Sequence, residues 1–141
     1  ASADVAAGWV WPTGMPTPVL RAFDPPAMPW GPGHRGVDLG IAAGGDVRAA
    51  GPGTVAYAGL LVDRPVVSVL HEGGLRTTYE PVDPAVVSGQ AVAAGEVLGT
   101  LADQSSAQPH AGLHWGARFG KNEYIDPLRL LLGPAVLKPW D

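Results

Sequence analysis

The stretch VVSVLHEGGLRTTYE, residues 66–80, decides the expected fold. Its two ends are rich in β-branched residues, and Glu72, Gly73 and Gly74 lie between them. β-branched side chains fit a pleated sheet, and two adjacent glycines supply the backbone freedom of a tight turn. We therefore expect an antiparallel hairpin whose strands cover residues 66–71 and 75–80.

Short apolar segments of the same kind recur along the 141 residues. They predict further strands at residues 47–50, 53–60, 97–101 and 113–118. The 20 glycines and 15 prolines fall between these segments and interrupt helical patterns. One short helical segment is expected at 126–132, where Asp126 can cap the first turn and Pro127 fits within it. The fold class is therefore all-β, a compact antiparallel sandwich or small barrel.

Proline is frequent near the N-terminus, where Trp9, Trp11, Phe23 and Trp30 also lie. Large aromatic side chains are costly to leave in water, so this segment is expected to pack on the core as an extended arm. We divide the chain into this arm, residues 1–30, a β domain, residues 31–133, and a C-terminal tail, residues 134–141.

Composition limits the classes of partner. With 46% hydrophobic and 16% charged residues, the chain is expected to form a globular domain. The net charge is -4 and the nine lysines and arginines are spread singly, so nucleic acid is not an expected partner. No apolar run approaches the roughly 20 residues of a membrane span. Ala1, Ser2 and Ala3 are typical of a signal-peptidase site, although a shortened chain would begin in the same way.

Two segments carry candidate metal ligands: GPGHRGVDLG, residues 31–40, and HAGLHWGAR, residues 110–118. His34 and Asp38 are four residues apart, so on an extended segment both side chains point to one side. Alternation in the second segment places His114 opposite the apolar Leu113 and Trp115. Two histidines and a carboxylate, together with a water, is a composition that catalytic zinc sites use. The chain has no cysteine, so any metal must sit on such ligands.

The spacing of these residues is also compatible with a site that holds no metal, and on spacing alone this second interpretation is favoured. In that interpretation His34 and Asp38 form a hydrogen-bonded pair, and His114 is a partly buried core residue. His71 is expected to be an exposed turn residue. Asp24 and His71 are also the candidates for a fourth ligand that would close a metal site.

Four ordered motifs between residues 30 and 132 resemble one family, the LytM and lysostaphin type of zinc endopeptidases that cut peptide cross-bridges in bacterial peptidoglycan. The motifs are GHRGVDLG, VRAAGPGTVAYAG, SGQAVAAGEVLG and LHWGAR…YIDPLRLL. The resemblance implies a groove floored by a sheet, with His34, Asp38 and His114 as zinc (Zn2+) ligands. It also implies a peptidoglycan peptide as partner and an extracytoplasmic location, secreted or associated with the bacterial cell envelope.

The chain departs from the family at both catalytic histidines. The family's H-x-H segment corresponds to Gly112, Leu113 and His114, and its Y-x-H segment to Tyr79, Glu80 and Pro81. Proline has no side-chain donor or acceptor to replace histidine. Glu80 and His110 are the candidate replacement bases.

Three hypotheses follow. The favoured one is a domain that keeps zinc but is catalytically impaired, acting as a cell-wall binding or regulatory module, with an unidentified regulatory protein as a further possible partner. The second is a working zinc endopeptidase that uses Glu80 or His110. The third is a metal-free carbohydrate- or peptide-binding module. Tyr79, Trp115 and Arg35 are the candidate substrate contacts.

Overall fold

The structure, a computed structural model, describes residues 8–27, 32–103 and 112–132. These residues form short strands connected by turns. The strands are β1 (Val19–Arg21), β2 (Gly36–Leu39), β3 (Asp46–Arg48), β4 (Gly53–Leu61), β5 (Arg64–Leu70), β6 (Leu75–Glu80), β7 (Val82–Pro84), β8 (Ala91–Val92), β9 (Val97–Leu101), β10 (Leu113–Phe119) and β11 (Glu123–Ile125). Two 3₁₀ turns complete the elements, η1 (Glu72–Gly74) and η2 (Pro127–Leu131). No helix in the described residues is long and apolar enough to cross a membrane.

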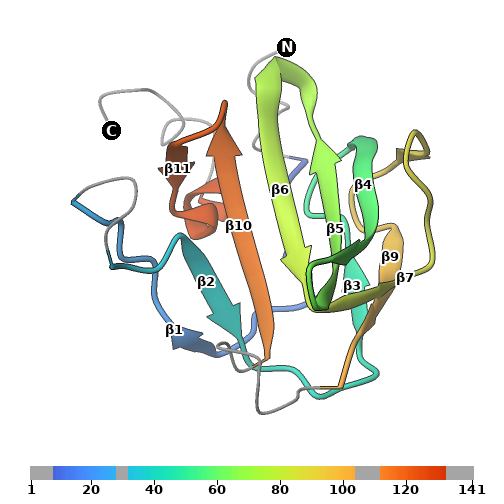
Figure 1. The fold of residues 1–141 in the computed structure, drawn as a ribbon, viewed down its shortest axis with the longest axis horizontal. Helices are drawn as coiled ribbons and strands as arrows, with labels where there is room; N and C mark the ends of the chain where they lie inside the picture. The colour runs from blue at the N-terminus through green and yellow to red at the C-terminus, as the bar shows by residue number, and fades with distance from the viewer. Residues whose placement is uncertain (1–7, 28–31, 104–111, 133–141) are drawn as a thin grey trace.

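The strands form two antiparallel sheets. The larger has the order β1-β2-β10-β6-β5-β4-β8, with β11 paired to β10, and the smaller has the order β3-β9-β7. The all-β, antiparallel prediction is confirmed, and neither sheet closes into a barrel within the described part of the chain. β10 runs between β2 and β6 (Figure 1). The last long strand therefore joins two segments that are far apart in sequence.

Each of the six predicted strands overlaps an observed one, and the predicted hairpin is β5 paired with β6. Gly73 and Gly74 have φ of +87° and +88°, the left-handed conformation that glycine adopts without strain. The helical segment is the short turn η2, where the Asp126 carboxylate accepts a hydrogen bond from the Leu128 N–H at 3.1 Å. Strands β1, β2, β7 and β11, each three or four residues long, have no counterpart in the sequence-based prediction.

Alternation along β6 and β10 gives the larger sheet two different faces. The side chains of Leu75, Thr77 and Tyr79 in β6 are buried, and the residues between them are half-buried on the other face. In β10, Leu113 and Trp115 are likewise fully buried. Since side chains of a strand point alternately to opposite faces, one face of the sheet is core and the other is available for a site.

The described part of the N-terminal arm, residues 8–27, lies against the domain. Trp9 is 8% exposed and covers Gly51, where a Cβ atom would lie 2.7 Å from the indole ring. The Val10 N–H donates to the Ala50 carbonyl at 2.8 Å. Trp11 and Phe23 pack on the core as partly buried residues. The fourth aromatic residue of the predicted arm, Trp30, lies outside the described residues.

His71 corrects a sequence-based expectation, because it is buried rather than exposed in the turn. Its Nδ1 lies 2.8 Å from the Pro52 carbonyl, and its Nε2 lies 2.7 Å from the Thr77 hydroxyl. Thr77 lies 2.7 Å from the Tyr79 hydroxyl, which accepts from the Ala50 N–H at 3.0 Å. A neutral imidazole that donates from Nδ1 satisfies every bond of this chain. The network ties the larger sheet to the loop after β3.

Burial lowers the pKa of His71 below its ordinary 6.5. The groups that face its ring are Trp9, the Pro52 carbonyl and Thr77, and none of them carries a charge. Below pH 6.5 the His71 imidazole is protonated more readily in the unfolded chain than in the folded one. The free energy of unfolding therefore falls as the pH drops. The slope from this group is at most about 1.4 kcal/mol per pH unit. We expect His71→Gln, whose amide can make both hydrogen bonds, to show a shallower fall than wild type in urea unfolding between pH 7 and 5. Equal slopes would contradict this role.

Candidate metal centre and adjoining groove

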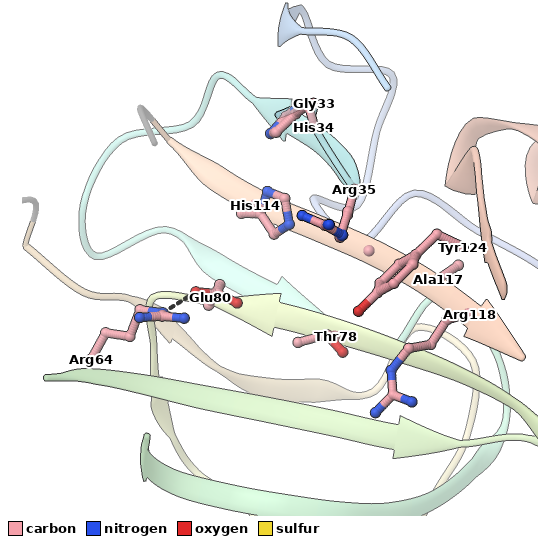
Figure 2. Close-up of a pocket in the computed structure, with 11 residues that line it drawn as sticks. Gly33, His34, Arg35, Arg64, Thr78, Glu80, His114, Ala117, Arg118 and Tyr124 are labelled. Atoms are coloured by element: carbon pink, nitrogen blue, oxygen red, sulfur yellow. Dashed lines mark hydrogen bonds and ion pairs between the residues drawn. The ribbon is translucent and has the colours of Figure 1, made fainter. Parts of the chain in front are cut away.

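Three side chains from two segments meet at one end of β10. Asp38 on β2 lies directly opposite His114 on β10 in the antiparallel register, and His34 precedes β2. One ligand atom from each lies within 4.8 Å of the other two. The rings of His34 and His114 lie edge to face with their centroids 5.0 Å apart, and both residues line the pocket drawn in Figure 2. The structure therefore brings together the three predicted ligands, whose role as ligands stays a prediction.

Asp38 lies between the two imidazoles. Its Oδ1 is 3.1 Å from Nε2 of His34 and 2.9 Å from Nδ1 of His114. His34 and Asp38 are each 2% exposed, and the side chain of His114 is 12% exposed. A buried carboxylate is costly without a positive charge or hydrogen-bond donors nearby, so Asp38 needs such a partner within this cluster.

The donor set fits a divalent metal ion. Nδ1 of His34 lies 2.9 Å from the Ala22 carbonyl, to which it donates a proton, so in a neutral ring Nε2 carries the lone pair. Desolvation lowers the pKa of His34, which favours the neutral ring, although the Ala22 carbonyl and Asp38 act in the opposite direction. A lone pair on Nε2 and a carboxylate oxygen then face each other at 3.1 Å. A cation between them removes this repulsion, and the carbonyl behind His34 fixes the ring as outer partners of metal ligands do.

The arm before the β domain supports His34 through its backbone as well. Asp24 and His34 exchange two backbone hydrogen bonds of 2.9 and 2.6 Å. A Cβ atom on Gly33 would lie 2.5 Å from the Asp24 carbonyl oxygen, so glycine permits this close approach. Neither of the candidate fourth ligands, Asp24 and His71, belongs to the cluster of described ligand atoms.

A pocket of about 350 Å³ adjoins His114 on the outer face of the sheet (Figure 2). Gly116 on β10 forms part of its floor, which is low there because glycine has no side chain. The ring of His114 lies over Gly36, where a Cβ atom would come within 2.9 Å of it. The remaining lining residues are Gly33, His34, Arg35, Arg64, Thr78, Glu80, Ala117, Arg118 and Tyr124.

Glu80 faces this pocket, whereas its neighbour Tyr79 faces the core. Glu80 lies directly opposite His114 in the register of β6 and β10. Its carboxylate forms an ion pair with the Arg64 guanidinium, which also lies 3.5 Å from Asp63. The candidate base is therefore held by a cation at the edge of the pocket. The other candidate base, His110, lies outside the described residues.

Burial corrects two of the three expected substrate contacts. Tyr79 and Trp115 are both 0% exposed, because alternation places them on the core face of the sheet. Burial raises the pKa of Tyr79 to about 12. Arg35 does line the pocket, with its guanidinium 5.8 Å from the centre of the Tyr124 ring.

Arg64, Thr78 and Tyr124 are lining residues that the sequence did not reveal as part of a site. Thr78 had a usable signal, because it lies two residues before Glu80 in a predicted strand and so shares its face. Arg64 and Tyr124 had none, since only strand order brings β5 and β11 to the neighbourhood of β2.

Gly112, at the position of the family's first H-x-H histidine, lies just before β10 begins. Its φ is +69°, and a Cβ atom there would lie 2.1 Å from the Leu39 carbonyl oxygen. A side chain of any kind is therefore incompatible with this backbone.

The model of peptidase family M23 matches residues 32–127. The chain belongs to peptidase family M23. The family resemblance proposed from the motifs is confirmed. The chain is 52% identical over 134 residues to an uncharacterized protein of Mycobacterium tuberculosis, covering 92% of this chain and 54% of that protein. It is 31% identical over 126 residues to the uncharacterized lipoprotein YgeR of Escherichia coli, covering 87% and 47%. The chain thus spans about half the length of the curated relatives it matches.

Solved structures share the fold of this M23 domain. The catalytic domain of lysostaphin from Staphylococcus simulans superposes with a TM-score of 0.70 at 22% identity, covering 83% of this chain and 93% of that chain. A chain of the SpoIIIAH and SpoIIQ complex gives a TM-score of 0.68 at 22% identity, covering 85% and 97%. A zinc-containing peptidase from Vibrio cholerae gives 0.57 at 24% identity, covering 77% and 35%.

We expect Gly33→Ala to weaken metal binding at this M23 site, because the added methyl group pushes the Asp24 carbonyl away from His34 and loosens the imidazole. Loss of outer-shell support typically lowers metal affinity about 10- to 100-fold. Zinc affinity by competition with a coloured chelator measures the effect. Gly73→Ala is the matched control, since its φ is also positive but no atom lies within 4 Å of the added Cβ. Equal affinities of the two variants would contradict the supporting role of the arm.

Proposed function

We propose that this M23 domain holds zinc at His34, Asp38 and His114 but is catalytically impaired, and that it serves as a peptidoglycan-binding or regulatory module of the bacterial cell envelope. The observation that carries the proposal is that the metal-ligand positions are kept, whereas the positions of the catalytic histidines are not. Three ligand atoms converge within 4.8 Å, while the two positions of the family's catalytic histidines are Gly112 and Pro81.

Zinc is the proposed metal because two imidazole nitrogens and one carboxylate oxygen match its preferred donors. When bound, zinc supplies a Lewis acid that polarises the carbonyl group of a peptide. The protein's part is to orient His34 through the Ala22 carbonyl and to place His114 over Gly36. Both arrangements favour tight binding and say nothing of turnover.

Cleavage of a peptide requires proton transfer, and the two positions that carry histidines in the family have no proton-transferring side chain in this chain. General acid and base groups typically contribute about 10²- to 10⁴-fold each to a rate. Pro81 offers neither a donor nor an acceptor on its side chain, and Gly112 has no side chain at all. Loss of both helpers leaves a site able to bind a peptide carbonyl but slow to cleave it.

The alternative is an active endopeptidase with Glu80 or His110 as the replacement base. One observation favours it: Glu80 lies opposite His114 on the groove face of the sheet. The ion pair of Glu80 with Arg64 argues against it, because this carboxylate is already engaged by a guanidinium at the edge of the pocket. The metal-free module that would bind through Tyr79 and Trp115 loses its proposed contacts, since both are buried.

The envelope location and a protein partner are supported by relatives only. YgeR of Escherichia coli is named a lipoprotein, and a chain from the complex of SpoIIIAH and SpoIIQ shares this fold. We include both in the proposal, with the partner's chemistry unspecified.

We expect purified wild-type protein to contain zinc and Asp38→Ala to lose it, because removal of the shared carboxylate leaves two imidazoles alone. Elemental analysis measures the metal. On the same samples, wild type is expected to sediment with purified peptidoglycan and to release no peptides from it. Failure of metal-loaded wild type to sediment would contradict the binding function.

Peptide release by wild type would instead support the active enzyme. Glu80→Gln then identifies the base, with Glu72→Gln as the control for loss of an exposed carboxylate outside the pocket. Release that disappears in Glu80→Gln, while zinc is retained, would replace the proposed function by the alternative.

Returning the family's histidine at one position is expected to damage the fold rather than restore activity. Gly112→His places a side chain at φ +69° and against the Leu39 carbonyl, so we expect destabilisation beyond the roughly 1–3 kcal/mol of a left-handed non-glycine residue. Urea unfolding measures it. Gly95→His is the control, because Gly95 has φ +83° with no atom near its added Cβ. A Gly112→His variant as stable as this control, and able to release peptides, would show that the histidine fits.

A further inference from the structure

The groove beside the ligand cluster has cations at the end away from His114. We propose that Arg35, Arg118 and Tyr124 form a subsite for the carboxylate of an extended peptide that lies along β10 with its other end at the His34–Asp38–His114 cluster. This inference deepens the proposed function and rests on it.

The register of three strands sets the length of the groove. Asp38, His114 and Glu80 form one row across β2, β10 and β6. Gly36, Gly116 and Thr78 form the next row on the same face. Arg118 follows two residues further along β10, so its Cα lies about 13 Å from that of His114 at roughly 3.3 Å per residue. An extended peptide segment of about four residues spans this distance.

The middle row leaves room for such a peptide. Gly116 and Thr78 line the pocket and are both small, whereas Gly36 lies under the ring of His114. β2 and β6 are both already paired to β10, so the ligand cannot add as a further strand over this floor. Recognition must come from side chains along the groove walls.

Positive charge gathers beyond this row. Arg118 lies directly opposite Arg76 on β6 and directly opposite Tyr124 on β11. Within the described ranges, no carboxylate lies in ion-pair distance of Arg118 or Arg76. Arg118 lines the pocket, whereas Arg76 does not. The Nη1 group of Arg118 donates to the Gly120 carbonyl, so an anion in the pocket would meet the remaining donors of this guanidinium. Arg35 adds a third guanidinium, held over the Tyr124 ring from the segment before β2.

The opposite end of the pocket differs. There Arg64 is already paired with Glu80, as Figure 2 shows, whereas Arg118 and Tyr124 lie together at the other end. The two ends of the groove therefore differ, with the Arg64–Glu80 ion pair beside His114 and Arg118 lining the pocket beyond Gly116. Arginine matches the two oxygens of a carboxylate with a planar fork of donors, so the ligand group that fits this end is a carboxylate. The overall charge of -4 does not oppose this, because recognition here is local.

Two peptides test the subsite: N-acetyl-tetraalanine with a free carboxylate, and the same peptide as its C-terminal amide. Acetylation removes the amino charge, so the pair differs only at the end expected to meet Arg118. Affinities are measured by calorimetry with the full zinc-loaded chain. We expect wild type to bind the acid at least about 10-fold more tightly than the amide, since hydrogen bonds between charged groups are the strong ones. Added salt should reduce the preference.

Two variants locate the carboxylate. Arg118→Gln and Arg35→Gln, which come from different segments, are each expected to reduce the preference at least several-fold with zinc content unchanged. Lys121→Gln is the control, since it removes an exposed cation from the neighbouring β10–β11 turn without touching the pocket. Thermal melting shows whether each variant is folded. If Arg118→Gln is unfolded, the result for Arg35→Gln decides the test.

Three outcomes would overturn the inference: equal binding of the two peptides, no binding of either, or a preference that both arginine variants retain in full. The last would mean that the carboxylate binds the metal directly. Sedimentation with peptidoglycan is run in parallel on wild type. If it persists while the preference is absent, only this inference fails, and if sedimentation is absent the proposed function fails on its own evidence.

Discussion

The pairing of β10 between β2 and β6 is the constraint on which the rest depends. It sets Asp38, His114 and Glu80 in one row although they lie far apart in the chain. The same register puts Trp115 and Tyr79 side by side in the core. A slip of one residue would exchange the two faces, burying the imidazole and exposing the indole. Core packing and the site are therefore specified by one alignment.

Burial of the Asp38 carboxylate is the main electrostatic cost of the site. Its carboxylate is buried between two imidazoles, one of which is already committed to the Ala22 carbonyl. That carbonyl belongs to the arm, outside the segment matched by the family model. The arm thus contributes to the site through its backbone, and a sequence motif, which specifies residue types only, does not reveal such a contact.

The groove combines chemically different groups along a short distance. The ligand cluster and the Glu80–Arg64 pair occupy one end, Gly116 and Thr78 the middle, and Arg118 with Tyr124 the other end. Such an arrangement suits a ligand with distinct groups along its length. Under the proposed function it lacks the groups that move a proton during cleavage, since the motifs align Gly112 and Pro81 with the family's histidines. The proposed function therefore separates binding of a peptide from its cleavage.

The resemblance to the family joined His114 to the pair of His34 and Asp38. The sequence by itself determined the β character, the hairpin through Gly73 and Gly74, the capping of η2 by Asp126, and the spacing that puts His34 beside Asp38. These follow from local spacing, turn chemistry and alternation, which act within a few residues. Tertiary structure alone decided the burial of His71, Tyr79 and Trp115, the pairing of Glu80 with Arg64, and the arrival of Tyr124 at the groove. Each depends on which strands lie side by side, and strand order is a property of long-range packing that no local pattern contains.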